Sequence, residues 1–147
     1  MIAYHQARRL ALQGLACLDV QGEKALEMLD RFIADTRENL ETVVYARQLM
    51  RDVFAARVEL DELLSGQAQH WEVPRMAMVD RNILRLVAYE MTRTPLPATV
   101  AIDEAMKLAT EFSSAQSARF INGVLDAVAK KVKDPGASGQ EPEKSSL

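Results

Sequence analysis

The stretch Met76 to Met91, MAMVDRNILRLVAYEM, constrains the fold more than any other part of the chain. At 100° per residue, its apolar side chains cover more than half of a helical wheel, which is too wide for a helix that lies on a surface. Such a helix must be covered on several sides. The pattern therefore predicts a central core helix, whose apolar arc consists of Ile83, Leu84, Leu86, Val87, Ala88 and Met91.

Two carboxylates, Asp80 and Glu90, fall inside that apolar arc, and the polar side of the wheel carries Arg81, Asn82, Arg85 and Tyr89. A buried carboxylate without a partner is costly, so Asp80 must be paired, hydrogen-bonded or placed at the rim of an interface. Two interpretations stay open. Asp80 is either a structural residue, favoured by the helix dipole or paired with an arginine, or a contact for a protein partner.

Helical periodicity continues before the central stretch, and no segment alternates as a strand does. Residues 3–18 and 25–36 predict two helices, and Gly14 marks a place where another helix approaches closely. Residues 37–65 contain neither Gly nor Pro. A straight helix of that length would extend about 43 Å, which exceeds the width of a domain of this size. We therefore expect a break between Ala55 and Asp61.

Proline and serine signals mark the later boundaries. Pro95 and Pro97 end the central helix, and Pro97 is suited to open the next one. Ser113 and Gln116 fit a capping box that starts the last helix. Trp71 is expected to seal the preceding loop against the core.

The last residues differ in composition from the rest of the chain. Residues 134–147 are rich in Gly, Pro, Ser and charge, and predict a disordered tail. The folded domain is therefore expected to span residues 1–133, and its fold class is expected to be all-α, a bundle of about seven helices.

The inventory of reactive residues argues against an enzyme or a metal protein. Cys17 is the one cysteine, and His5 and His70 are far apart, so the chain has no internal disulfide and no zinc-ligand spacing. No serine has a nearby base, and no carboxylate pair resembles a catalytic dyad. No signal segment or membrane span is visible. We expect a cytoplasmic protein that is not an enzyme and uses no cofactor.

Charge is distributed unevenly along the chain. The formal net charge is -3, of which residues 134–147 contribute -2. From residue 113 to residue 133 the charge is instead +3, because one acidic residue opposes four basic ones. A basic end on a nearly neutral body can bind a polyanion weakly.

Phe120 does not fit the apolar stripe of the last helix, which consists of Ile121, Val124, Leu125, Val128 and Val132. It lies on a border of small and basic residues, with Arg119 and Lys130 close by. Such an aromatic is suited to stack on an unpaired base while cations hold phosphates. The alternative is that a neighbouring helix covers it.

Four segments together resemble the NusB family of bacterial transcription antitermination factors. They are ARRLALQGL near the start, DRNILRLVAYEM in the centre, VAIDEAMKLATEFSS after the two prolines and SARFINGVLDAVAK at the end, and they span most of residues 7 to 131. The resemblance implies an all-α fold of two helical subdomains. It also implies an RNA ligand, the boxA leader of ribosomal RNA operons, and a protein partner, the small-subunit ribosomal protein NusE, with which RNA polymerase reads through terminators.

The resemblance also implies roles for particular residues. Family members often carry more basic residues where this chain has Tyr4, His5 and Gln6, and an aromatic where it has Ala16. Asp80 occupies the acidic position that lies near the partner surface in the family. The residues expected to contact RNA are Arg8, Arg9, Arg119, Phe120, Lys130 and Lys131.

Two other functions remain possible. The first is a helical protein-interaction module with weak or lost RNA binding, which the few arginines near the start favour. The second is an accessory domain, because NusB-like domains also occur fused to ribosomal RNA cytosine methyltransferases. At 147 residues, this chain is expected to have no room for a methyl-donor domain.

Overall fold

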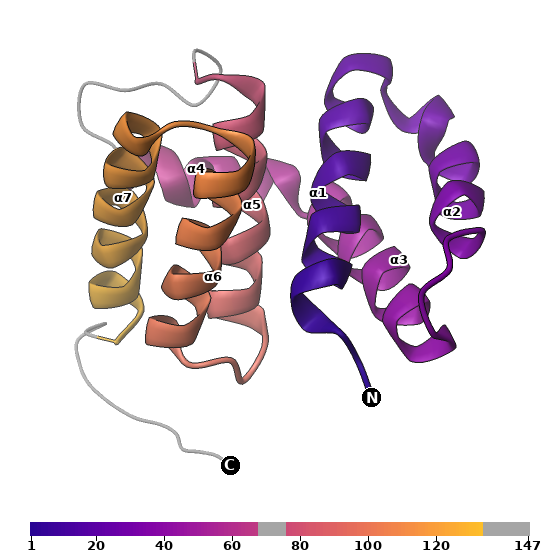
Figure 1. Ribbon diagram of the computed structural model, residues 1–147. Helices are drawn as coiled ribbons and strands as arrows, with labels where there is room; N and C mark the ends of the chain where they lie inside the picture. Colours follow the sequence, from indigo (N-terminus) through magenta and orange to yellow (C-terminus); the bar gives the residue numbers. More distant parts are fainter. Residues whose placement is uncertain (68–75, 134–147) are drawn as a thin grey trace.

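Every regular element that the computed structural model describes is helical (Figure 1). The structure describes residues 1–67 and 76–133, and these form seven α-helices and one 3₁₀ turn, with no strand among them. The prediction of an all-α fold is confirmed. Trp71 and the predicted tail lie outside the described residues. The elements are α1 (Tyr4–Gln21), η1 (Glu23–Ala25), α2 (Leu26–Ala34), α3 (Leu40–Ala55), α4 (Arg57–Gln67), α5 (Met78–Arg93), α6 (Ala98–Phe112) and α7 (Ala115–Lys133).

The helices form two groups that meet along α1 and α5. Figure 1 shows α1, α2 and α3 on one side and α4, α5, α6 and α7 on the other. Within the first group α1 packs on α3, and within the second α6 packs on both α5 and α7. Because α1 also packs directly on α5, the seam between the groups is a helix-to-helix contact.

The central position predicted for the second-half helix is confirmed. Within the described residues, α5 packs against α1, α3, α4, α6 and α7. Five of its apolar side chains, Ile83, Leu84, Leu86, Val87 and Ala88, have no exposed surface. The polar side of the helix is buried as well, since Asn82 is fully buried and Arg85 is only 8% exposed. The helical wheel did not reveal this, because polar partners on α1 and α4 cover that side.

The expected break in residues 37–65 occurs at Ala56, between α3 and α4. The backbone of Ala56 leaves the helical region, with φ -94° and ψ 8°, while its N–H still donates to the carbonyl of Asp52. This break lets α3 pack in the first group and α4 pack against α5 and α7 in the second. The predicted break is therefore confirmed.

Gly14 permits the close packing of α1 on α3. A Cβ built at this position would collide with the sulfur of Met50, which is fully buried. The sequence-based expectation of a close helix approach at Gly14 is confirmed.

The start of the last helix differs by one residue from the predicted capping box. The Oγ of Ser114, not that of Ser113, accepts the hydrogen bond from a backbone N–H in the first turn of α7, at 3.0 Å from Ser117 N. Ser113 instead donates its hydroxyl to Asp80. The predicted cap at Ser113 is therefore wrong, because a tertiary acceptor takes that hydroxyl.

One buried carboxylate attaches α2 to α3. Asp30 on α2 accepts hydrogen bonds from Arg47 at 3.1 Å and 3.1 Å, and from Arg51 at 3.3 Å and 2.6 Å. Hydrogen bonds from Arg47 and then from Arg51 lower the pKa of Asp30 to about 2. The carboxylate therefore stays ionised at every pH at which the protein is expected to work.

We predict that Asp30 makes stability depend on acid. Its folded-state pKa of about 2 lies below the ordinary value of 3.8, so its stabilisation is complete above pH 4 and is lost as the pH falls toward 2. Asp30→Asn should lower the urea midpoint at neutral pH, and the difference from wild type should close in that acid range. A constant difference across the range would contradict the prediction.

Candidate functional site

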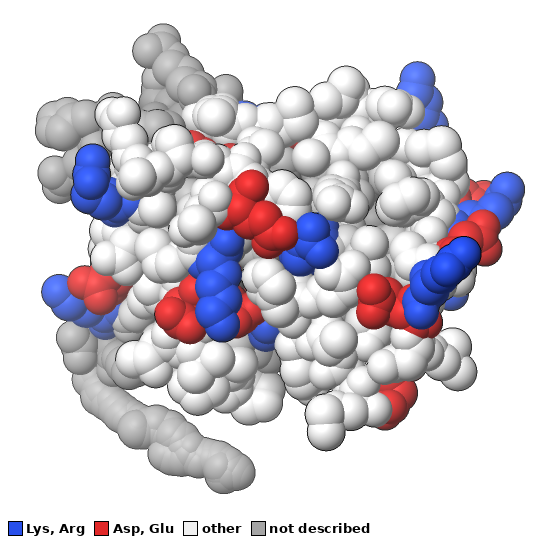
Figure 2. Space-filling view, in the orientation of Figure 1, with Lys and Arg blue, Asp and Glu red and all other residues white. Residues whose placement is uncertain are grey.

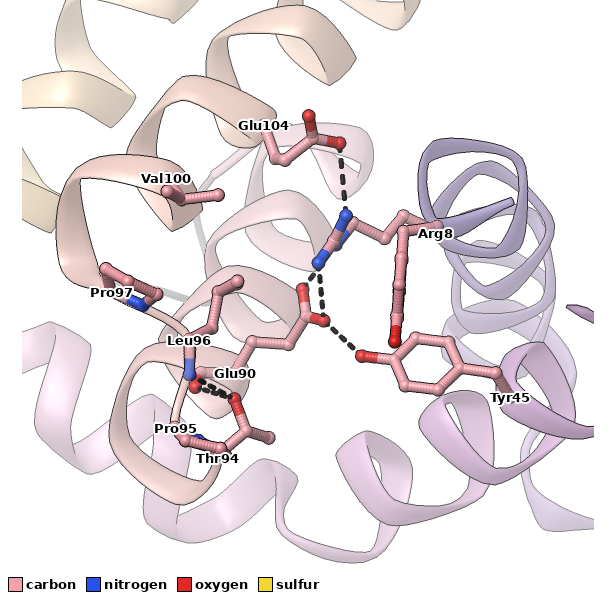
Figure 3. Close-up of a pocket in the computed structure, with 10 residues that line it drawn as sticks. Arg8, Tyr45, Glu90, Thr94, Pro95, Leu96, Pro97, Val100 and Glu104 are labelled. Atoms are coloured by element: carbon pink, nitrogen blue, oxygen red, sulfur yellow. Dashed lines mark hydrogen bonds and ion pairs between the residues drawn. The ribbon is translucent and has the colours of Figure 1, made fainter. Parts of the chain in front are cut away.

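A buried ion-pair network crosses the seam between the two helix groups (Figure 3). Arg8 on α1 donates from Nε to Glu90 on α5 at 2.7 Å and from Nη2 to the same carboxylate at 3.1 Å. Its Nη1 donates to Glu104 on α6 at 3.2 Å. The side chains of Arg8 and Glu90 are only 5% and 1% exposed. One arginine thus links three helices.

Tyr45 and His5 extend this network. The Tyr45 hydroxyl on α3 donates to Glu90 at 2.6 Å, and His5 Nδ1 lies 3.1 Å from Glu104. Burial, together with the hydrogen bond to Glu90, raises the pKa of Tyr45. Burial alone would lower the pKa of Arg8, but the hydrogen bond and the charge of Glu90 outweigh it and raise that pKa. The network therefore holds its arginine protonated and its tyrosine neutral.

A pocket of about 590 Å³ opens beside the network (Figure 3). Its walls come from α1, α3, α5, α6 and the proline-containing connection before α6. The charged side chains at its base are already bonded to one another, so they offer no free nucleophile or base. The apolar walls suit an apolar or planar group. The lining residues are Tyr4, Arg8, Tyr45, Glu90, Thr94, Pro95, Leu96, Pro97, Val100 and Glu104.

A second polar cluster joins α1 and α5 near the other end of the seam. Asp19 on α1 accepts hydrogen bonds from Arg81 at 2.7 Å and 3.0 Å and from Asn82 at 3.0 Å. Arg85 lies 3.3 Å from Asp19 and donates to Asp61 on α4 at 2.6 Å and 2.7 Å. Burial would raise the pKa of Asp19, but its hydrogen bonds and the nearby arginine charges outweigh that effect and lower it.

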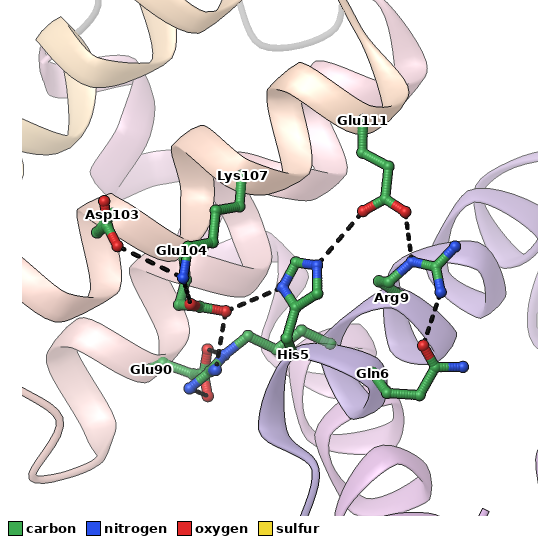
Figure 4. Close-up of polar contacts among 9 residues, drawn as sticks. His5, Gln6, Arg9, Glu90, Asp103, Glu104, Lys107 and Glu111 are labelled. Carbon is green, nitrogen blue, oxygen red and sulfur yellow. Dashed lines mark hydrogen bonds and ion pairs between the residues drawn. The ribbon is translucent and has the colours of Figure 1, made fainter.

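Arg9 is neutralised on the surface between α1 and α6 (Figure 4). Its Nε lies 2.6 Å from Glu111, and its Nη1 donates to Gln6 at 2.6 Å. On the same surface, Lys107 pairs with Glu104 at 3.2 Å. Figure 2 shows basic and acidic atoms side by side over this face. The face therefore has no extended basic patch.

Three exposed cations of the second group lie on α7. Arg119 and Lys131 are exposed and form no ion pair with another described residue, and Lys130 pairs loosely with Asp126 at 3.6 Å. Phe120 is half-buried and packs against the core. Arg119 and Lys130 are about 16 Å apart along the helix axis. This strip can attract phosphates, and the partly covered Phe120 ring lies within it.

Asp80 is buried inside the second group. Its carboxylate is 3% exposed in the folded chain and accepts hydrogen bonds from Ser113 at 2.6 Å and Ser117 at 2.7 Å. It therefore joins the start of α5 to the connection between α6 and α7. An arginine partner or a contact surface was expected for Asp80, and the observed partners are two serines.

The structure thus separates the six residues expected to contact RNA. Four lie on α7, while Arg8 is buried and Arg9 is paired on the other side of the seam. Burial between two carboxylates gives no support to an RNA contact by Arg8. The roles of Glu104 and Tyr45 were not visible in the sequence, because their partners, Arg8 and Glu90, lie 96 and 45 residues away.

Within residues 1–67 and 76–133, no group of three or more His, Cys, Asp or Glu side chains is arranged to hold a metal ion. No helix in that part of the chain is long and apolar enough to cross a membrane.

We predict that Arg8 is required for stability. Arg8→Met should lower the free energy of unfolding by about 3–5 kcal/mol, because Glu90 is left buried without its cation. Urea unfolding followed by circular dichroism measures this loss. The double variant Arg8→Met/Glu90→Met should lose less than the single variant. Equal stability of Arg8→Met and wild type would refute the role assigned to the pair.

Asp80 provides a second stability test. Asp80→Ala should lower the free energy of unfolding by about 1–3 kcal/mol, because two hydroxyls lose their acceptor. Asp80→Asn should lose less, since its amide can accept from one serine and donate to the other. If Asp80→Ala unfolds at the wild-type urea concentration, the two hydrogen bonds do not stabilise the fold.

Curated relatives are similar to this chain over most of its length. The Transcription antitermination protein NusB of Solibacter usitatus (strain Ellin6076) is 40% identical over 140 residues, which cover 93% of this chain and 95% of the relative. The protein of the same name from Anaeromyxobacter sp. (strain Fw109-5) is 42% identical over 125 residues, covering 84% and 87%. These relatives are named as transcription proteins and not as enzymes.

Solved structures agree with these relatives. A T. maritima NusB structure superposes with a TM-score of 0.81 at 28% identity, covering 89% of this chain and 94% of the other. A structure of the antitermination factors NusB and NusE with double-stranded RNA gives 0.77 at 25% identity, covering 88% and 98%. The family model described as NusB family matches residues 5–130. With its helices arranged as in these structures and its sequence matched along nearly the whole fold, the chain belongs to the NusB family.

Proposed function

We propose that this protein is a transcription antitermination factor that binds boxA RNA of ribosomal RNA operon leaders together with NusE, so that RNA polymerase reads through terminators. The observation that carries the RNA part of the proposal is the strip on α7, where Arg119, Lys130 and Lys131 are exposed beside Phe120. The proposal places the protein in the cytoplasm.

The chemistry of the strip matches single-stranded RNA. Exposed cations neutralise backbone phosphates without reading the sequence, and an aromatic ring stacks on an unpaired base. Phe120 is half-buried and held against the core, so its ring would lose little conformational freedom when a base stacks on it. Arg119 immediately precedes Phe120 on α7 and can hold a neighbouring phosphate.

The partner is supported by a relative of the same fold. The solved complex of NusB, NusE and double-stranded RNA contains a chain that is 25% identical to this one. We carry the partnership with NusE to this protein because the two chains share a family. The proposal does not depend on Asp80 as a contact, since its carboxylate is buried against Ser113 and Ser117.

The small number of unpaired cations implies cooperative assembly. Arg8 and Arg9 are engaged with carboxylates of the same chain, which leaves the α7 strip as the main basic surface of the proposed site. A weak site gains affinity when a second RNA-binding protein docks beside it, because the two contacts become linked. The protein alone should therefore bind RNA weakly.

We predict that NusE strengthens RNA binding and that the α7 strip is required for it. Fluorescence anisotropy of labelled RNA measures the affinity. The protein should bind boxA RNA more tightly than scrambled RNA, and NusE should increase its affinity for boxA. Phe120→Leu should weaken binding by about 5- to 100-fold through lost stacking. Arg119→Gln should weaken it several-fold and reduce its dependence on salt.

The control for these variants is Arg93→Gln on α5. Arg93 is 41% exposed and lies on α5 outside the α7 strip, so its loss should leave RNA binding unchanged. Circular dichroism must show that each variant is folded. Equal RNA affinity with and without NusE would contradict the cooperative assembly.

A second function is favoured by one observation. Because Arg8 and Arg9 are both neutralised within the chain, the protein can be a helical protein-interaction module with weak or lost RNA binding. In that case the folded protein would bind NusE in the same experiment without retaining boxA RNA at any salt concentration.

A further inference from the structure

The ion pair that joins α2 to α3 contains one more cation than it needs. Asp30 carries one negative charge, and Arg47 and Arg51 both bind it. One arginine would neutralise the carboxylate and attach the two helices. The second arginine leaves a net charge of +1 on the cluster.

That surplus charge is accessible. Each arginine uses its Nε and Nη2 for Asp30, and in the described part of the chain neither Nη1 forms a hydrogen bond. The side chains of Arg47 and Arg51 are 40% and 46% exposed, whereas that of Asp30 is 9% exposed. The unused edges of both guanidiniums can therefore reach a ligand from solvent.

The cluster is also held in place before any ligand arrives. Arg47 and Arg51 are four residues apart on α3, so they lie on one face with a rise of about 6 Å between them. Bidentate hydrogen bonds to Asp30 fix the plane of each guanidinium, which reduces the conformational entropy that the arginines lose when a ligand binds. The pKa of Asp30, lowered to about 2, keeps the net charge constant near neutral pH.

No other described carboxylate lies within ion-pair distance of Arg47 or Arg51. On α2, the exposed Glu27 lies 3.8 Å from Arg31, so these two side chains balance each other. On α3, the carboxylate of Asp52 accepts hydrogen bonds from Gln48 at 2.8 Å and from Tyr89 on α5 at 3.2 Å, and it forms no ion pair with either arginine.

We infer that Arg47 and Arg51 form an anion site that holds backbone phosphates of bound single-stranded RNA. A planar guanidinium fork matches the oxygens of a phosphate group. The site belongs to the first helix group and is distinct from the α7 strip, so it would hold nucleotides that flank those bound at Phe120. The choice of RNA as the source of phosphate rests on the proposed function.

Arg51→Gln tests the inference without breaking the contact between α2 and α3, because Arg47 still pairs with Asp30. RNA affinity is measured by fluorescence anisotropy with a boxA RNA that keeps its flanking nucleotides, with NusE present, between about 50 and 200 mM salt. The variant should bind about 3- to 10-fold more weakly at the lowest salt. The slope of log affinity against log salt should become shallower by about 0.7, the value of one phosphate contact on a single strand.

Two matched variants complete the experiment. Arg51→Lys keeps the charge and should keep the wild-type slope. Arg93→Gln removes an arginine of similar exposure that has its own carboxylate, and should leave slope and affinity unchanged. Urea unfolding of each variant shows whether the α2–α3 contact survives.

The outcomes separate this inference from the proposed function. If wild type binds RNA and Arg51→Gln has the wild-type slope, the inference is overturned and the proposed function stands. If wild type binds no RNA in any condition, both fail. If Arg51→Gln weakens NusE binding without RNA and leaves the RNA slope unchanged, the arginines hold acidic groups of a protein, and the RNA assignment is overturned.

Discussion

The contact between α1 and α5 depends on two charge clusters of opposite polarity, one buried and one partly buried. Near one end an arginine of α1, Arg8, binds Glu90 of α5, and near the other an aspartate of α1, Asp19, binds Arg81 of α5. Shifting or reversing one helix against the other would bring like charges together or leave a carboxylate buried alone, and either change costs several kcal/mol. Apolar side chains alone would tolerate several registers. The charges therefore select one arrangement of the two helix groups.

The same clusters decide which basic residues are left for a ligand. Arg8, Arg81 and Arg85 stabilise the seam, and Arg9 is neutralised by Glu111 beside it. In the described part of the chain, exposed cations without close partners lie away from the seam, for example Arg119 and Lys131 on α7. The positive charge available to RNA is thus smaller than the count of arginines suggests.

Local patterns in the sequence predicted the elements well and their partners poorly. The wide apolar arc identified α5 as central, and the length of residues 37–65 predicted a break between Ala55 and Asp61, which the structure places at Ala56. Both conclusions need only helix geometry. Gly14 was recognisable for the same reason, since a missing side chain permits close packing whatever the partner is.

Partners separated by many residues could not be read from periodicity. Nothing local shows that Glu90 meets Arg8, or that the acceptor for Ser113 is Asp80 and not the backbone of α7. The sequence indicated that the buried carboxylate of Asp80 needs a partner. It did not indicate which helix supplies that partner. The cap at Ser113 was misread, and the burial of Arg8 was not foreseen, because both depend on tertiary contacts.

The separation of Arg8 and Glu90 along the chain also affects how the protein is made. They are 82 residues apart. At a synthesis rate of about 5–20 residues per second, roughly 4–16 s pass between the addition of Arg8 and the addition of its carboxylate partner. During that interval α2 and α3 can cover part of α1, but the side that α5 will occupy stays open. Until α5 is made, this face of α1 is therefore exposed and carries an arginine that lacks its main partner.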